Sequence, residues 1–180
     1  MRKIYYIPTS SLNFNNILSS ESISPSAFYS HRNFGYKRWT QIAENGLENV
    51  ILLYDDLRYF SRPDNGLEDH PLVVAVVLDE GNLVKCGSNV YYCDHTVYLD
   101  PWYTRFIFFT EQDKRTALSM SDSSSETKLI SLYRKGIIVR QPNSSQSYEI
   151  PSLDNVSLNM VYIDSDFRIN RIKGMLYGYY

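Results

Sequence analysis

The densest mixture of cations and aromatic rings in this 180-residue chain lies in residues 31–39. The stretch contains His31, Arg32, Phe34, Tyr36, Lys37, Arg38 and Trp39. A guanidinium group can hold a phosphate while a neighbouring aromatic ring stacks on a second ring of the ligand. We therefore take Arg32, Arg38 and Trp39 as candidate ligand-binding residues. The alternative is a solvated loop whose rings turn inward against the core.

Metal and nucleophile chemistry has weaker support in the sequence. Four residues could form a soft-metal set: His70, Cys86, Cys93 and His95. Six residues separate the two cysteines, which is outside the spacing of a zinc knuckle, so we predict no metal site. No serine lies in a Gly-x-Ser-x-Gly pattern, and no glycine-rich loop ends in Lys-Ser or Lys-Thr. Neither a nucleophile elbow nor a phosphate-binding P-loop is expected.

The most informative stretch of the chain is residues 4–25. An apolar β-prone run at 4–7 predicts a strand, and Pro8 is expected to end it because proline gives no N–H to a ladder. Ser10 or Ser11 can then cap a short helix. Its apolar positions are Leu12, Phe14, Ile17 and Leu18. Ile23 and Pro25 return the chain to extended geometry.

Several short β-prone runs follow, at residues 50–54, 72–78, 90–93, 96–99, 104–109 and 137–140. The run at 72–78, LVVAVVL, is apolar at every position, so both of its faces should be covered. We expect it at the centre of one sheet. Residues 83–86 are expected to pair back against it as a hairpin arm.

Two further helices are predicted between these runs. Thr110 can cap a helix that continues to Met120. Ser123 and Glu126 have capping-box spacing, and the apolar residues after them give that second helix a buried face. Gly136 is expected to end it.

These elements predict an α+β fold with a mixed, mostly antiparallel sheet and three or four short helices in a single domain, because the connections between strands are of hairpin length. We assign residues 1–163 to the α+β core domain and residues 164–180 to a C-terminal helix. The chain stops within an apolar aromatic stretch. This favours an N-terminal module of a longer protein.

Composition narrows the function without deciding it. The chain has 16 tyrosines against 8 phenylalanines and 2 tryptophans, and its net charge is −2. That charge gives no argument for non-specific nucleic-acid binding. Tyrosine suits both β-rich cores and wet interfaces. No signal peptide or membrane span is predicted, and two cysteines without an export signal favour the cytoplasm.

The opening pattern resembles one branch of the ADP-ribosyltransferase fold, which includes DarT-like toxins and tRNA 2′-phosphotransferases. Members begin with Tyr-His-x-Thr, a short spacer and Asn-Leu-x-x-Ile-Leu. Here Tyr5 matches the leading tyrosine, and residues 13–18 match the helical part with Phe14 in place of leucine. The family histidine falls on Tyr6 and the threonine on Pro8. The resemblance covers residues 4–25.

This resemblance implies NAD as a cofactor and a carboxylate that holds the ribose and stabilises an oxocarbenium-like state. The phenol of Tyr6 would then bind the ribose, and the cations near Arg32 would hold the pyrophosphate. Glu111 and Glu126 are candidate carboxylates, of which we favour Glu126 as the catalytic residue. The alternative for both is a structural role in the first turn of a helix.

The leading interpretation is a binding or interaction module of a larger bacterial-type protein, without a cofactor. Its partner would be another protein or the remainder of a longer chain. The alternative is an NAD-dependent ADP-ribosyltransferase-like enzyme, active or degenerate.

Overall fold

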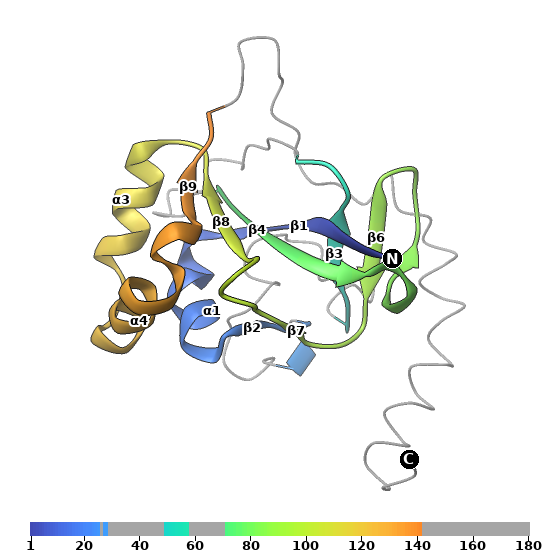
Figure 1. Ribbon diagram of the computed structural model, residues 1–180, viewed down its shortest axis with the longest axis horizontal. Coiled ribbons are helices and arrows are strands. Elements are labelled where there is room, and N and C mark those ends of the chain that lie inside the picture. The colour runs from blue at the N-terminus through green and yellow to red at the C-terminus, as the bar shows by residue number, and fades with distance from the viewer. Residues whose placement is uncertain (26, 29–48, 58–70, 142–180) are drawn as a thin grey trace, which may run out of the picture.

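A computed structural model describes residues 1–25, 27–28, 49–57 and 71–141 of the chain. Most of its strands form one seven-stranded sheet in the order β5-β6-β3-β1-β4-β8-β9 (Figure 1). The strands are β1 (Arg2–Ser10), β3 (Ile51–Tyr54), β4 (Pro71–Asp79), β5 (Val84–Lys85), β6 (Val90–Cys93), β8 (Arg105–Phe108) and β9 (Ile137–Val139). A second, two-stranded sheet pairs β2 (Ser22–Ile23) with β7 (Val97–Tyr98).

The helices lie beside the sheet rather than within its strand order (Figure 1). The α-helices are α1 (Phe14–Ser20), α3 (Glu111–Ser119) and α4 (Ser123–Lys128). Shorter helical turns are η1 (Ser11–Asn13), η5 (Glu80–Asn82), the π-helical η6 (Leu129–Tyr133) and η7 (Arg134–Gly136). Together with a mostly antiparallel sheet, these elements confirm the α+β fold class.

Strands β1 and β4 form the middle of the large sheet. They pair antiparallel along their whole length, from Arg2 opposite Asp79 to Ser10 opposite Pro71. On its other side β4 pairs with β8. The prediction that the apolar run at 72–78 is an interior strand is therefore confirmed, since it has a hydrogen-bonded neighbour on each edge.

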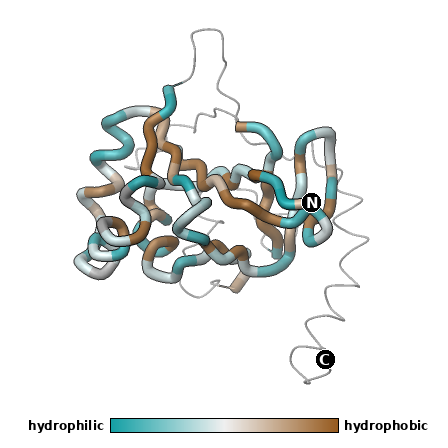
Figure 2. The backbone as a smooth tube through the Cα atoms, viewed as in Figure 1, coloured by the Kyte–Doolittle hydropathy of each residue, from teal (hydrophilic) through white to brown (hydrophobic). Residues whose placement is uncertain are grey.

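Both faces of β4 are buried, as the unbroken apolar run predicted. One face of β4 places Leu72, Val74 and Val76 in the larger hydrophobic cluster of the protein. The other face places Val73 and Ala75 in a smaller cluster with residues of β8 and with Phe109. Along the chain, the most hydrophobic segments coincide with these central strands (Figure 2).

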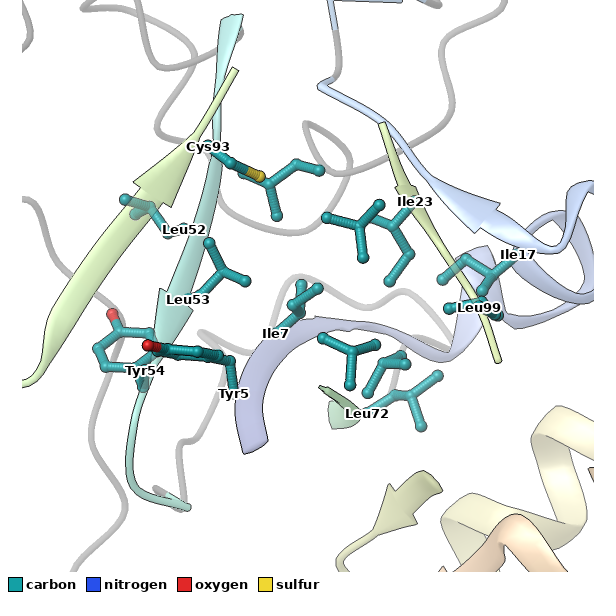
Figure 3. Close-up of a cluster of buried hydrophobic side chains, with 14 of the residues drawn as sticks. Tyr5, Ile7, Ile17, Ile23, Leu52, Leu53, Tyr54, Leu72, Cys93 and Leu99 are labelled. Atoms are coloured by element: carbon teal, nitrogen blue, oxygen red, sulfur yellow. The ribbon is translucent and has the colours of Figure 1, made fainter. Parts of the chain in front are cut away.

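The larger cluster joins the two sheets. Ile7 of β1 points between Leu53 and Leu72, while Ile23 and Leu99 approach the same space from the small sheet and its continuation (Figure 3). Burial of a side chain of this size contributes about 1.5–3 kcal/mol. The opening stretch is therefore folded against the same core as β4.

The prediction that Pro8 ends the first strand is wrong. Strand β1 continues to Ser10, and Pro8 lies opposite Val73 of β4. The physical reason is that β3, the other neighbour of β1, is in register with it only at Tyr6 opposite Tyr54. Near Pro8 the strand is thus paired along a single edge, where a proline can be accommodated.

The turn after β1 forms as the sequence predicts. The Ser10 hydroxyl accepts a hydrogen bond from the Leu12 amide at the start of η1, and α1 follows. The Asn13 side-chain amide donates to the Thr9 hydroxyl at 3.2 Å, and both residues are buried. Phe14 of α1 packs edge-on against two phenylalanines of β8.

The predicted hairpin between residues 83–86 and the central strand is also wrong. Strand β5 pairs with β6 at the far edge of the sheet, with Val84 opposite Tyr92. The places beside β4 are already taken by β1 and β8. Because both edges of β4 are occupied, the η5 turn must lead the chain away from it.

The capping predictions have opposite outcomes. Thr110 and Asp113 form a complete capping box at the start of α3. Helix α4, in contrast, is capped by Asp122, whose carboxylate accepts from the Ser125 amide at 2.8 Å. The predicted capping box of Ser123 with Glu126 is therefore wrong, because an aspartate one residue earlier supplies the stronger acceptor.

Gly136 ends the helical segment as predicted, and a close backbone approach explains why it is glycine. Strand β9, which follows it, runs parallel to β8. A Cβ atom at position 136 would lie 2.8 Å from the carbonyl oxygen of Thr104 and 3.9 Å from the Arg105 Cα. The residue thus seats η7 directly on the segment that enters β8.

We expect Gly136→Ala to lower the free energy of unfolding by about 1–3 kcal/mol, because an added methyl group meets a backbone oxygen that cannot rotate away. Chemical denaturation of the variant measures this loss. Gly81→Ala is the control, since the nearest atom to its Cβ is 3.9 Å away, on a side chain. Equal stability of the two variants would contradict the close approach at Gly136.

The remaining fold predictions lie outside the described residues. They include the strands expected after residue 141, the boundary at 163 and the C-terminal helix at 164–180.

Candidate functional site

A rigid turn connects the small sheet to β8. The Tyr103 and Thr104 amides both donate to the Asp100 carbonyl oxygen, at 3.0 and 2.7 Å. The Asp100 carboxylate accepts from the Trp102 amide at 2.9 Å, and the Asp100 amide donates to the Thr104 hydroxyl. Pro101 at the second position of the turn further restricts the backbone. The turn is therefore fixed by its own hydrogen bonds.

Three large aromatic side chains project from this turn and the strand before it. The exposed fractions are 76% for Tyr98, 82% for Trp102 and 55% for Tyr103. Their neighbours Val97, Leu99 and Thr104 are buried and anchor the backbone. We call Tyr98, Trp102 and Tyr103 the aromatic surface. Single exposed apolar residues are ordinary, but three rings within six positions on a fixed backbone are not.

Two cations belong to the backbone segments that meet at Thr104, at the end of the turn. The Arg105 guanidinium donates to the carbonyl oxygens of Trp102 and Thr104, at 3.1 and 2.7 Å, which also ties the turn to β8. Lys135 is exposed and precedes Gly136, the residue that touches the Thr104 carbonyl. Within the described part of the chain, neither Arg105 nor Lys135 forms an ion pair.

The acidic groups near the turn are engaged in contacts with the protein itself. Asp100 holds the turn through its carboxylate. Glu21, whose carbonyl oxygen accepts from the Leu99 amide, pairs through its side chain with Lys128 at 3.2 Å. Burial raises the pKa of the Tyr133 hydroxyl to about 12, and the charges of Glu21 and Asp100 add to the shift. Glu21 is thus neutralised by Lys128, and Asp100 keeps its charge, so the two cations Arg105 and Lys135 outnumber the one carboxylate without an ion pair among the described residues near the turn.

The residues predicted for the site from the sequence are not brought together. Tyr6 is half-buried and packs with the smaller hydrophobic cluster. Glu126 is exposed on α4, which packs against α1, and α1 covers the opposite face of the sheet through Phe14. The second candidate carboxylate, Glu111, is exposed and paired with Lys114. Arg32, Arg38 and Trp39 lie outside the described residues.

Tyr6 nevertheless shares a face of the sheet with a cation that the sequence did not single out. Tyr6 lies opposite Ala75 on β4, and Ala75 lies opposite Arg105 on β8. Paired residues of neighbouring strands project to the same face, and two strand spacings amount to about 10 Å. Along this row of the described strands, Ala75 lies between Tyr6 and Arg105.

The hydroxyl groups of two buried tyrosines, Tyr5 on β1 and Tyr91 on β6, differ in their hydrogen bonding. The rings of Tyr5 and Tyr91 pack edge to face at 5.2 Å. The Tyr91 hydroxyl donates to the Asp55 carboxylate, whereas the Tyr5 hydroxyl has no partner among the described residues. Burial raises the pKa of the Tyr5 hydroxyl above its ordinary value.

We expect Tyr5→Phe to leave the free energy of unfolding unchanged or to raise it by up to about 1 kcal/mol, because a buried hydroxyl without a partner is costly. Tyr91→Phe should instead lower it by about 0.5–1.5 kcal/mol, since it removes a hydrogen bond. Urea denaturation of the pair tests this. A larger loss for Tyr5→Phe than for Tyr91→Phe would contradict these hydrogen-bond assignments.

Both cysteines are buried in the core. The thiol of Cys86 donates to the Val90 carbonyl and that of Cys93 to the His95 carbonyl. Burial raises the pKa of Cys86 to about 11 and that of Cys93 to about 12. Across the described ranges, no group of three His, Cys, Asp or Glu residues is arranged to hold a metal ion.

The raised pKa values predict slow thiol chemistry in the folded state. At pH 8 we expect a disulfide reagent to react with neither thiol until the protein is unfolded in guanidinium. Absorbance of the thiolate released from the reagent follows the reaction. Rapid reaction in native buffer would refute the burial of these thiols.

The same pKa shifts add stability to the folded state. This stability is complete below about pH 8.5 and is lost as the pH rises toward 11–12, because the unfolded chain then releases its thiol protons first.

Comparison with known proteins found no matching family model, no similar curated protein and no similar solved structure. None of the described helices is long and apolar enough to cross a membrane. The functional assignment must therefore come from the site itself.

The aromatic surface was not among the candidate sites predicted from the sequence. The signal was present nonetheless. Aspartate followed by proline favours the first two positions of a type I turn, which places Pro101 and Trp102 at its tip and Tyr103 directly after it. Tryptophan and tyrosine in such a turn are candidates for binding.

Proposed function

We propose that this protein is a binding module that contacts a protein partner, or another part of a longer chain, through the aromatic surface. The observation that carries this proposal is the exposure of Tyr98, Trp102 and Tyr103 on a turn fixed by four hydrogen bonds around Asp100.

The composition of this surface matches that of interface hot spots. Tryptophan, tyrosine and arginine are the residue types that most often dominate binding energy between proteins. Trp102, Tyr103 and Arg105 lie within four positions, and Arg105 holds the Trp102 carbonyl. A turn that is already ordered loses little conformational freedom when it binds, so more of the contact energy remains as affinity.

Because the partner is unidentified, the proposal is tested with a library of random 12-residue peptides displayed on phage. Peptides selected on the wild-type protein are synthesised and their affinities measured by calorimetry. If the proposal is correct, the selected peptides bind the aromatic surface and lose affinity when Trp102 is replaced. Selected peptides that bind the Trp102→Ala variant as tightly as the wild type would refute it.

A second candidate is an NAD-using enzyme of the ADP-ribosyltransferase type, active or degenerate. It is supported by the strand, turn and helix formed by residues 4–20 and by the row that places Tyr6 and Arg105 on one face of the sheet. In this proposal Tyr6 contacts a ribose and Arg105 a phosphate, while Glu126 lies on the other side of the sheet.

Thermal unfolding with NAD separates the two candidates. A ligand at one hundred times its Kd stabilises the folded state by about 2.7 kcal/mol. Stabilisation by millimolar NAD that disappears in Tyr6→Phe would favour the enzyme. An unchanged melting temperature favours the binding module.

A further inference from the structure

From the charges around the aromatic surface we infer that its partner is an acidic peptide segment, which places its carboxylates on Arg105 and Lys135 and its apolar side chains on the three rings. This inference rests on the proposed binding function and specifies the chemistry of the partner.

Positive charge exceeds negative charge at the surface. Arg105 and Lys135 lack ion-pair partners among the described residues. Of the nearby carboxylates, Glu21 is neutralised by Lys128, whereas Asp100 accepts from a neutral amide and keeps its charge, so two cations face one unpaired carboxylate. A basic peptide would thus meet unpaired cations, whereas an acidic one would neutralise them. The chain as a whole has a net charge of −2, so this local excess is opposite in sign to the rest of the molecule.

Arg105 is held in a geometry that suits a carboxylate. Two carbonyl oxygens occupy one terminal nitrogen of its guanidinium, at 2.7 and 3.1 Å. Its other terminal nitrogen and its Nε atom donate no hydrogen bond to a described residue. These N–H groups can bind a carboxylate in the forked geometry that arginine favours. Because the occupied nitrogen already fixes the side chain, the remaining donors are oriented beside Trp102.

The three rings carry polar groups as well as apolar faces. Tyr98 and Tyr103 offer a hydroxyl at the tip of an apolar ring, and Trp102 offers an indole N–H. All are hydrogen-bond donors, which suits a partner rich in carboxylate oxygens. Acidic residues interleaved with apolar ones would satisfy both the donors and the ring faces.

The peptides selected from the random library provide the test. We expect their mean net charge to be negative relative to the unselected library, and their affinity to fall at least fivefold when salt is raised from about 0.05 to about 0.5 M. Lys135→Glu should weaken binding about threefold or more. Lys85→Glu is the matched control, because Lys85 is exposed on β5 at the opposite edge of the sheet, and it should change affinity less than twofold.

These measurements test the acidic partner and the binding surface separately. Peptides that require Trp102 but are neutral or basic, and that bind equally at both salt concentrations, would overturn the acidic partner while leaving the binding surface in place. Peptides that ignore the replacement of Trp102 would overturn the binding surface itself. Arg105→Lys keeps the charge but loses the fork, and we expect it to weaken acidic peptides by at least threefold.

Discussion

Replacing Phe14 by alanine is expected to lower the free energy of unfolding by about 3–5 kcal/mol. Phe14 is fully buried at the first position of α1. Its ring packs edge to face with Phe106 at 5.2 Å and with Phe108 at 5.6 Å, and Phe106 in turn contacts Tyr133. Alanine would leave a cavity between α1 and β8 that side chains fixed on a central strand cannot fill.

The measurement is chemical denaturation, and Phe28→Ala is its control. Phe28 is the same residue type but is exposed, so its replacement should change stability by less than about 0.5 kcal/mol. Because a domain is stable by only about 5–15 kcal/mol, the core variant could lose a large part of its stability. A cost below about 1 kcal/mol for Phe14→Ala would show that α1 does not pack on the sheet as described.

Replacing Trp102 by alanine is expected to weaken binding of the selected peptides by about 2 kcal/mol or more, which is about 30-fold in Kd. The ring is 82% exposed in the free protein, so its removal should leave the melting temperature unchanged. Loss of affinity without loss of stability is what distinguishes a contact residue from a structural one. Trp102→Phe keeps an aromatic face and should retain part of the affinity.

The control for Trp102 is another exposed apolar residue in a different place. Leu132 lies on η6 and is also exposed. We expect Leu132→Ala to change peptide affinity less than twofold. If both variants weaken binding equally, exposure of apolar area alone explains the binding, and the aromatic surface has no special role.

The parts of the fold that the sequence predicted well are those set by local physics. An apolar run without alternation indicates a strand covered on both faces, and residues 72–78 form such a strand in the interior of the sheet. A serine or threonine before a periodic apolar pattern indicates a helix start, and both Ser10 and Thr110 cap one.

The errors arose where the outcome depends on distant neighbours. Pro8 stays within β1 because β3 is in register with β1 at a single position. Residues 83–86 turn away from β4 because β1 and β8 occupy both of its edges. No local pattern contains either fact, since strand order is decided by which edges remain free.

The candidate site was missed for a related reason. The Asp-Pro pair indicates a turn, but Trp102 and Tyr103 are residue types that are usually at least half-buried, and their exposure is a property of the folded chain. Conversely, the sequence predicted Tyr6 and Glu126 as parts of one site. The alternation of side chains along β1 and the position of α4 place them on opposite sides of the sheet.

The most direct test of the binding surface is amide chemical-shift mapping of the wild-type protein titrated with the tightest selected peptide. We predict that the largest changes cluster at Tyr98, at Asp100, at residues 102–105 and at Lys135. Changes concentrated elsewhere, for example on the β5–β6 hairpin or around Tyr6, with the aromatic turn unaffected, would contradict the proposed function.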